Sequence, residues 1–168
     1  MNSMKLIAAL AAVAVAAPAL AALGTSVNGQ GALDPQRTFA VSARVNADGT
    51  ATGTATLINR AFSGDSGRGP YQAHFDITCG KMLDNKTMLI GGYANRTNDS
   101  NLKDSGFFIV RDEGEPGAGR DQISRVAFFD DDPNTVDPNP MRCLLTTPAD
   151  LPPLETIQRG NLQVQVSM

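Results

Sequence analysis

Acidic residues gather in two loop-like segments, and their spacing is the first feature of the chain that could support chemistry. The members are Asp112, Glu113, Glu115, Asp121, Asp130 and Asp132. Carboxylate oxygens are the ligands that Ca²⁺ prefers, so these residues are candidate metal ligands. Residues 130–134 begin like an EF-hand loop, but Thr135 and Met141 stand where that loop needs Gly and Glu. A looser calcium site and simple solvated loop charge are the two interpretations, and no other cofactor is expected.

Two short motifs resemble parts of catalytic sites but lack the partners that catalysis needs. Residues 64–67 read Gly-Asp-Ser-Gly, as in the nucleophile loop of chymotrypsin-like proteases. In that family the base and the acid precede the Ser, whereas the single histidine here, His74, follows it. His74 and Asp76 share the polar face of one predicted strand, which a solvated strand would also show. We therefore predict no catalytic residues.

The chain has two cysteines, Cys79 and Cys143. Two cysteines in an exported protein most often pair, because the compartment is oxidising. One histidine and two distant cysteines make a poor zinc site. We predict a disulfide, which would stabilise the fold by about 4 kcal/mol over a loop of this length.

The N-terminus has the three-part layout of a secretory signal peptide. Lys5 precedes an apolar run at 6–17, Pro18 ends the run, and small residues stand at Ala19 and Ala21. Such a run is too short to span a membrane, which takes about 20 residues. We predict a signal peptide at 1–21 and one mature domain at 22–168. The protein would then be secreted, or periplasmic in a Gram-negative organism.

The charge of the mature chain limits its partners. Without Lys5, 13 basic residues face 17 acidic ones, which gives a net charge of −4. Nucleic acids and anionic membranes both need a basic patch, so neither is expected, nor is a membrane span. The partner is expected to be an unidentified extracellular ligand. In a eukaryotic source, three sequons at predicted turns or loops would be glycosylated, at Asn85, Asn95 and Asn98.

Short alternating or apolar segments, separated by turn residues, predict the elements that must position these side chains. The predicted strands cover residues 39–45, 50–58, 71–79, 88–93, 107–110, 126–129 and 162–166, with an eighth at an edge if 25–33 pairs. The apolar runs at 88–93, 107–110 and 126–129 indicate strands covered on both faces. Residues 130–153 are rich in Pro and Asp and predict an irregular crossover. The sequence thus predicts an antiparallel β-barrel or β-sandwich of seven or eight strands.

Several of these segments together resemble a group of small, uncharacterised exported proteins. The resemblance rests on 39–43, 47–53, 76–79, 90–92, 110–115, 121–124 and 160–164. It implies an exported β-rich domain and carries no established activity. We expect a non-enzymatic domain with an extracellular binding or structural role. The alternative is a ligand-binding barrel or an enzyme, with a pocket lined by loop carboxylates.

Overall fold

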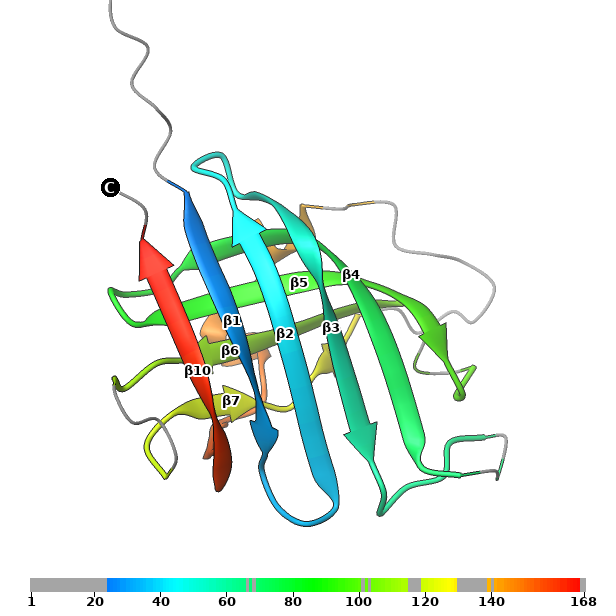
Figure 1. Cartoon of the computed structure of the whole chain (residues 1–168). Helices are drawn as coiled ribbons and strands as arrows, with labels where there is room; N and C mark the ends of the chain where they lie inside the picture. The colour runs from blue at the N-terminus through cyan, green and yellow to red at the C-terminus, as the bar shows by residue number, and fades with distance from the viewer. Residues whose placement is uncertain are drawn as a thin grey trace, which may run out of the picture.

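A single antiparallel sheet, curled into a half-barrel, forms the described part of the protein (Figure 1). The computed structural model describes residues 24–65, 67, 69–100, 102, 104–114, 119–129, 139 and 141–166. Its strands are β1 (Thr25–Ala32), β2 (Arg37–Val45), β3 (Thr50–Asn59), β4 (Tyr71–Met82), β5 (Thr87–Thr97), β6 (Ser105–Arg111), β7 (Gln122–Ser124), β8 (Ala127–Phe128), β9 (Leu154–Thr156) and β10 (Arg159–Val166). Two short 3₁₀ helices, η1 (Arg142–Leu144) and η2 (Pro148–Asp150), precede β9. The prediction of an all-β antiparallel fold is confirmed, and the sheet takes the form of a curled half-barrel.

The strand order explains the curl. The sheet runs β10-β1-β2-β3-β4-β5-β6-β7-β9, with β8 also paired to β6. β9 and β10 are almost consecutive in the chain, yet they stand at opposite ends of this order. The two residues between them bond to both ends, since Ile157 N donates to Asp121 O (2.8 Å) and Gln158 N donates to Ala32 O (2.9 Å). The ends of the sheet are therefore drawn towards each other.

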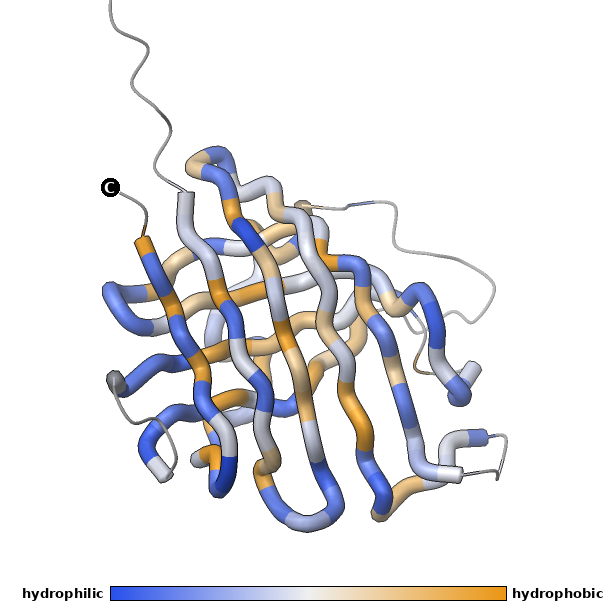
Figure 2. The backbone as a smooth tube through the Cα atoms, viewed as in Figure 1, coloured by the Kyte–Doolittle hydropathy of each residue, from blue (hydrophilic) through white to orange (hydrophobic). Residues whose placement is uncertain are grey.

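Alternating hydropathy places the main core on the concave side of the sheet. β2 and β4 alternate buried and exposed residues over most of their length, as the half-buried period predicts. Figure 2 shows the same alternation along the strands nearest the viewer. Phe39, Val41 and Phe75 are among the residues that meet Phe108 and Leu162 in this core. The turn between β2 and β3 forms as predicted, with Gly49 at φ +85°.

β5 and β6 are covered on both faces, which their unbroken apolar runs predicted. On the convex side a second cluster packs Leu89, Phe107 and Ile109 against Cys143 and Leu151. Gly91 makes room for this layer, because a Cβ there would stand 2.1 Å from the ring of Phe107. The segment containing η1 and η2 therefore acts as a cover over the outside of the sheet.

The predicted disulfide is present and attaches this cover. Cys79 in β4 is bonded to Cys143 in η1, and neither cysteine is exposed. The Lys81 ammonium donates to the carbonyls of Leu144 (3.0 Å) and Thr146 (2.7 Å), which holds the end of η1 to β4 as well. Cys79 is buried in this second cluster, whereas Phe75 and Ile77 of the same strand lie in the main core.

Several finer predictions differ from the structure. The described residues form ten strands instead of the predicted seven or eight, because residues 122–128 make two short strands and Leu154–Thr156 makes another. The first strand is not at an edge, since β1 lies between β10 and β2. Residues 141–153 include η1 and η2, so this part of the predicted irregular crossover has local structure, while 130–138 and 140 lie outside the described residues.

Candidate functional site

A cavity of about 480 Å³ opens at one end of the half-barrel. It lies where the β1–β2 turn, the β3–β4 connection and the residues around β7 meet. The backbone ties two of these segments together, because Arg60 N donates to Gln36 O at 2.8 Å. A volume of this size falls within the range of pockets that hold small molecules.

Apolar side chains form most of the cavity wall. The apolar lining residues are Leu33, Phe39, Leu57, Ile58, Ala61, Phe62, Tyr71, Leu102, Ile123, Val126 and Phe128. Phe39, Tyr71 and Ile123 are buried, whereas Phe62 is 43% exposed although its ring lies 5.6 Å from that of Tyr71. An exposed aromatic ring beside an apolar hollow is a surface that a ligand could cover.

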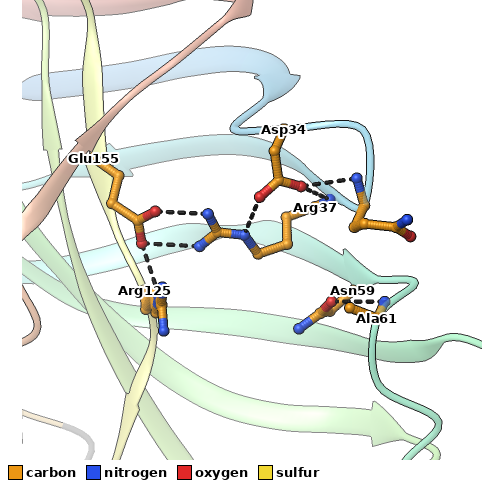
Figure 3. A network of polar contacts seen from close by, with 7 residues as sticks. Asp34, Arg37, Asn59, Ala61, Arg125 and Glu155 are labelled. Atoms are coloured by element: carbon orange, nitrogen blue, oxygen red, sulfur yellow. Dashed lines mark hydrogen bonds and ion pairs between the residues drawn. The ribbon is translucent and has the colours of Figure 1, made fainter.

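Three charged residues that line the cavity, Asp34, Arg37 and Arg125, form a chain of ion pairs with Glu155 of β9 (Figure 3). Arg37, at the start of β2, donates through Nε to Asp34 Oδ2 (2.7 Å). Both of its terminal nitrogens bind Glu155 of β9, at 2.9 and 2.6 Å. Arg125, just after β7, donates through Nε to Glu155 Oε1 at 2.8 Å. This chain, which we call the rim network (Asp34, Arg37, Arg125 and Glu155), joins β2 to the far end of the sheet.

The rim network fixes the charge of its members. The pKa of the Glu155 carboxyl is lowered from 4.5 to about 2, first by the hydrogen bonds from the Arg37 guanidinium and to a smaller extent by the hydrogen bond from Arg125. The pKa of Asp34 is also lowered, first by its hydrogen bond with Arg37. The pKa of Arg37 is raised by the same contact with Glu155. These shifts keep Asp34, Arg37 and Glu155 charged at neutral pH.

Tyr71 gives the cavity a polar group that stays uncharged. Burial raises the pKa of its hydroxyl to about 12. The hydroxyl donates to the carbonyl of Leu102 at 3.4 Å, which is a long hydrogen bond. Tyr71 thus contributes a ring and a neutral phenol to the cavity wall rather than a charge.

The first predicted acidic loop lies elsewhere, between β6 and β7, and two of its carboxylates bind backbone. Asp121 is fully buried, and it accepts hydrogen bonds from the backbone N–H groups of Glu113 (3.0 Å) and Leu162 (2.8 Å). Asp112 accepts from Gly114 N (2.7 Å) and Val164 N (2.9 Å). Leu162 and Val164 belong to the edge strand β10, so these two carboxylates occupy donors that strand pairing leaves open.

Of the other predicted ligands, Glu113 is the one that lies within the described residues. Glu113 forms ion pairs with Lys86 (3.0 Å) and Arg111 (3.2 Å), while Glu115, Asp130 and Asp132 lie outside the described residues. Across the part of the chain that the structure describes, no group of three or more His, Cys, Asp or Glu side chains is placed to hold a metal ion.

The remaining sequence motifs occupy scattered positions. His74 lies on β4 with its ring nitrogens near Thr56 Oγ1 (3.1 Å) and Gln72 Nε2 (3.2 Å). Asn85 is in the exposed β4–β5 turn, but Asn95 lies within β5 and not in a loop. The amide of Asn98 donates to Pro70 O at 2.8 Å. Ser66 of the Gly-Asp-Ser-Gly motif and the predicted signal peptide lie outside the described residues.

Sequence reasoning did not find the rim network. Arg37 and Glu155 are 118 residues apart, so no local spacing connects them. The one local signal is at residues 34–37, where Asp34 Oδ1 accepts the backbone N–H groups of Gln36 and Arg37 at 2.8 Å. An Asp at the start of a tight turn is typical of this arrangement.

Comparison with known proteins gives no identification, because no family model, curated protein or solved structure matches the chain. The resemblance to small exported proteins therefore stays a prediction. Of the helices in the described ranges, none has the length and apolar character needed to cross a membrane.

Proposed function

We propose that the protein is an exported, non-catalytic binding domain that holds a small, mainly apolar molecule in the cavity at the end of its half-barrel. The observation that carries this proposal is the cavity itself, with its apolar wall and charged rim. A few oriented polar groups on an apolar wall are what small-molecule sites commonly offer. The sheet and the disulfide would provide a rigid frame, so that little ordering is required when a ligand binds.

The export part of the proposal rests on the sequence and is supported by the disulfide. A bond between Cys79 and Cys143 is favoured in an oxidising compartment, outside the cytosol. The mature protein should begin near Ala22, and terminal peptides identified by mass spectrometry test this. A mature chain that retains residues 6–17 would contradict it.

The binding test uses a neutral fluorescent probe, N-phenyl-1-naphthylamine, whose emission rises in an apolar site. We expect saturable binding with one probe per chain. Leu57→Trp should weaken binding at least tenfold, because a larger side chain fills the cavity that Leu57 lines. Thr54→Trp is the matched control, since Thr54 is exposed on the same strand and does not line this cavity.

Two outcomes would overturn the binding proposal. One is the absence of probe binding by the wild-type protein. The other is equal binding by the wild type and by Leu57→Trp, which would place the probe elsewhere. Cooperative thermal unfolding must be recorded for all three proteins, because loosely packed states also bind such dyes.

A further inference from the structure

We infer that the ligand of this cavity is an amphipathic anion, whose negatively charged head group binds Arg125 while its apolar body enters the cavity. The inference rests on the proposed function and adds the chemical class of the ligand. Its observation is an asymmetry among the charged groups of the rim network, where both carboxylates accept hydrogen bonds from the protein while Arg125 keeps donors that the protein does not use.

Every carboxylate oxygen of the rim network accepts at least one hydrogen bond from the protein. Asp34 Oδ1 accepts two backbone N–H groups, and Oδ2 accepts Arg37 Nε. Glu155 Oε1 accepts from both arginines, and Oε2 accepts the second terminal nitrogen of Arg37. A cationic or donor-rich head group would have to displace these contacts, which are charge-assisted and strong.

The donors are engaged unequally. Arg37 uses all three of its guanidinium nitrogens on the two carboxylates. Arg125 uses only Nε, and its side chain is 66% exposed. Its two terminal nitrogens have no partner within the described chain. A guanidinium presenting two adjacent N–H groups fits a carboxylate, sulfonate or phosphate oxygen pair.

Asn59 supplies a second donor on the same rim. Its Oδ1 accepts the backbone N–H of Ala61 at 3.0 Å, which fixes the amide so that Nδ2 is the group left to donate. Figure 3 shows this nitrogen on the side of Asn59 that faces Arg125. The rim thus offers one cation and one neutral donor beside an apolar cavity, which is the complement of an anionic amphiphile.

The test compares two probes that share one skeleton. N-phenyl-1-naphthylamine is neutral, and 8-anilinonaphthalene-1-sulfonate adds a single sulfonate to it. In the wild type we expect the anionic probe to bind more tightly and to weaken as salt is added. Arg125→Gln should raise the Kd of the anionic probe about tenfold while the neutral probe changes less than about twofold. Arg125→Lys should recover part of the loss, because it restores the charge without the planar pair of donors.

The matched control is Arg60→Gln. Arg60 is an exposed cation next to Asn59 and does not line the cavity, so its removal changes net charge without touching the head-group position. We expect the Kd values of both probes to stay within about twofold of the wild type, since an exposed charge is well screened by solvent and salt.

The two proposals can fail separately. If the neutral probe does not bind the wild type, the proposed function fails. If the neutral probe binds but the anionic probe has no advantage, or if Arg125→Gln weakens both probes equally, the proposed function stands and the inference is overturned. Displacement of the neutral probe by dissolved decanoate, but not by decanol, would support a free anionic ligand. Displacement by phosphatidylglycerol vesicles instead would place the same chemistry on a lipid head group.

Discussion

Carboxylates serve different purposes in the β6–β7 connection and at the cavity rim. In the connection, Asp112 and Asp121 accept backbone N–H groups, including those of β10. At the rim, Asp34 and Glu155 hold arginine side chains. The first arrangement satisfies backbone donors at the edge of β10, and unpaired donors at a strand edge invite pairing with other chains. The second orients cations beside an apolar hollow.

Both arrangements connect the two ends of one curled sheet. Asp121 stands just before β7 and reaches β10, while Glu155 of β9 reaches Arg37 of β2. The first connection is made by a buried carboxylate and backbone, and the second by partly exposed side chains. The comparison teaches that carboxylates close together in the sequence can be structural, while charged residues far apart in the sequence can meet beside a cavity.

Replacing Asp121 should have the largest effect on stability. Asp121→Ala leaves the backbone N–H groups of Glu113 and Leu162 without their acceptor in a buried place. We expect a loss of about 2 to 4 kcal/mol in the free energy of unfolding, measured by denaturant titration. Asp112→Ala, at a less buried carboxylate, should cost about 1 kcal/mol. Equal losses for the two variants would contradict the difference in burial.

Replacing Glu155 should have a smaller effect on stability. Glu155→Gln removes the charge that holds both arginines, and we expect a loss of about 1 to 2 kcal/mol in the free energy of unfolding. Glu113→Gln is the matched control, because Glu113 also pairs with two cations, Lys86 and Arg111. Its loss should be within about 0.5 kcal/mol, as for ordinary surface pairs. If the control loses as much, the rim network has no special stabilising role.

Acid should remove the contribution of Glu155 within a defined range. The folded pKa of Glu155 is about 2 and its ordinary value is 4.5. A lowered carboxyl pKa stabilises the fold above the ordinary value, and this stabilisation is lost as pH falls towards the folded value. The difference in melting temperature between wild type and Glu155→Gln should therefore be constant above about pH 5 and shrink between pH 4.5 and 2. A difference that grew over this interval would contradict the assigned direction.

The local hydropathy pattern predicted most of the sheet, because a strand that buries one face alternates apolar and polar residues. The strands at 39–45 and 71–79 follow from this, and the covered strands β5 and β6 follow from their unbroken apolar runs. The interior position of β1 was not predictable in the same way. It depends on pairing with β10, for example Val27 with Val164, across most of the chain.

The candidate site was less predictable than the fold. Its rim depends on the curl that brings Glu155 of β9 to Arg37, and β9 is a three-residue strand with no usable period. The close spacing of acidic residues in the sequence pointed instead to the loop after β6. The disulfide was predictable because the expected export and the presence of two cysteines suffice to pair Cys79 with Cys143, without knowledge of topology.

Calcium should have the smallest effect on the melting temperature. Its addition tests the structural role assigned to the carboxylates of the β6–β7 connection. The oxygens of Asp112 and Asp121 are bonded to backbone, and Glu113 is paired with cations, so a calcium ion would have to replace these contacts. We expect millimolar calcium and subsequent chelation to change the melting temperature by less than about 1 °C, since stabilisation by mass action requires a site in the folded protein. A rise of several degrees that Asp112→Asn abolishes would show that this loop binds the ion. A rise that persists in Asp112→Asn but is lost in Asp130→Asn would assign the ion to the second acidic segment. Only the first of these two outcomes would contradict the interpretation of Asp112 and Asp121 as purely structural carboxylates.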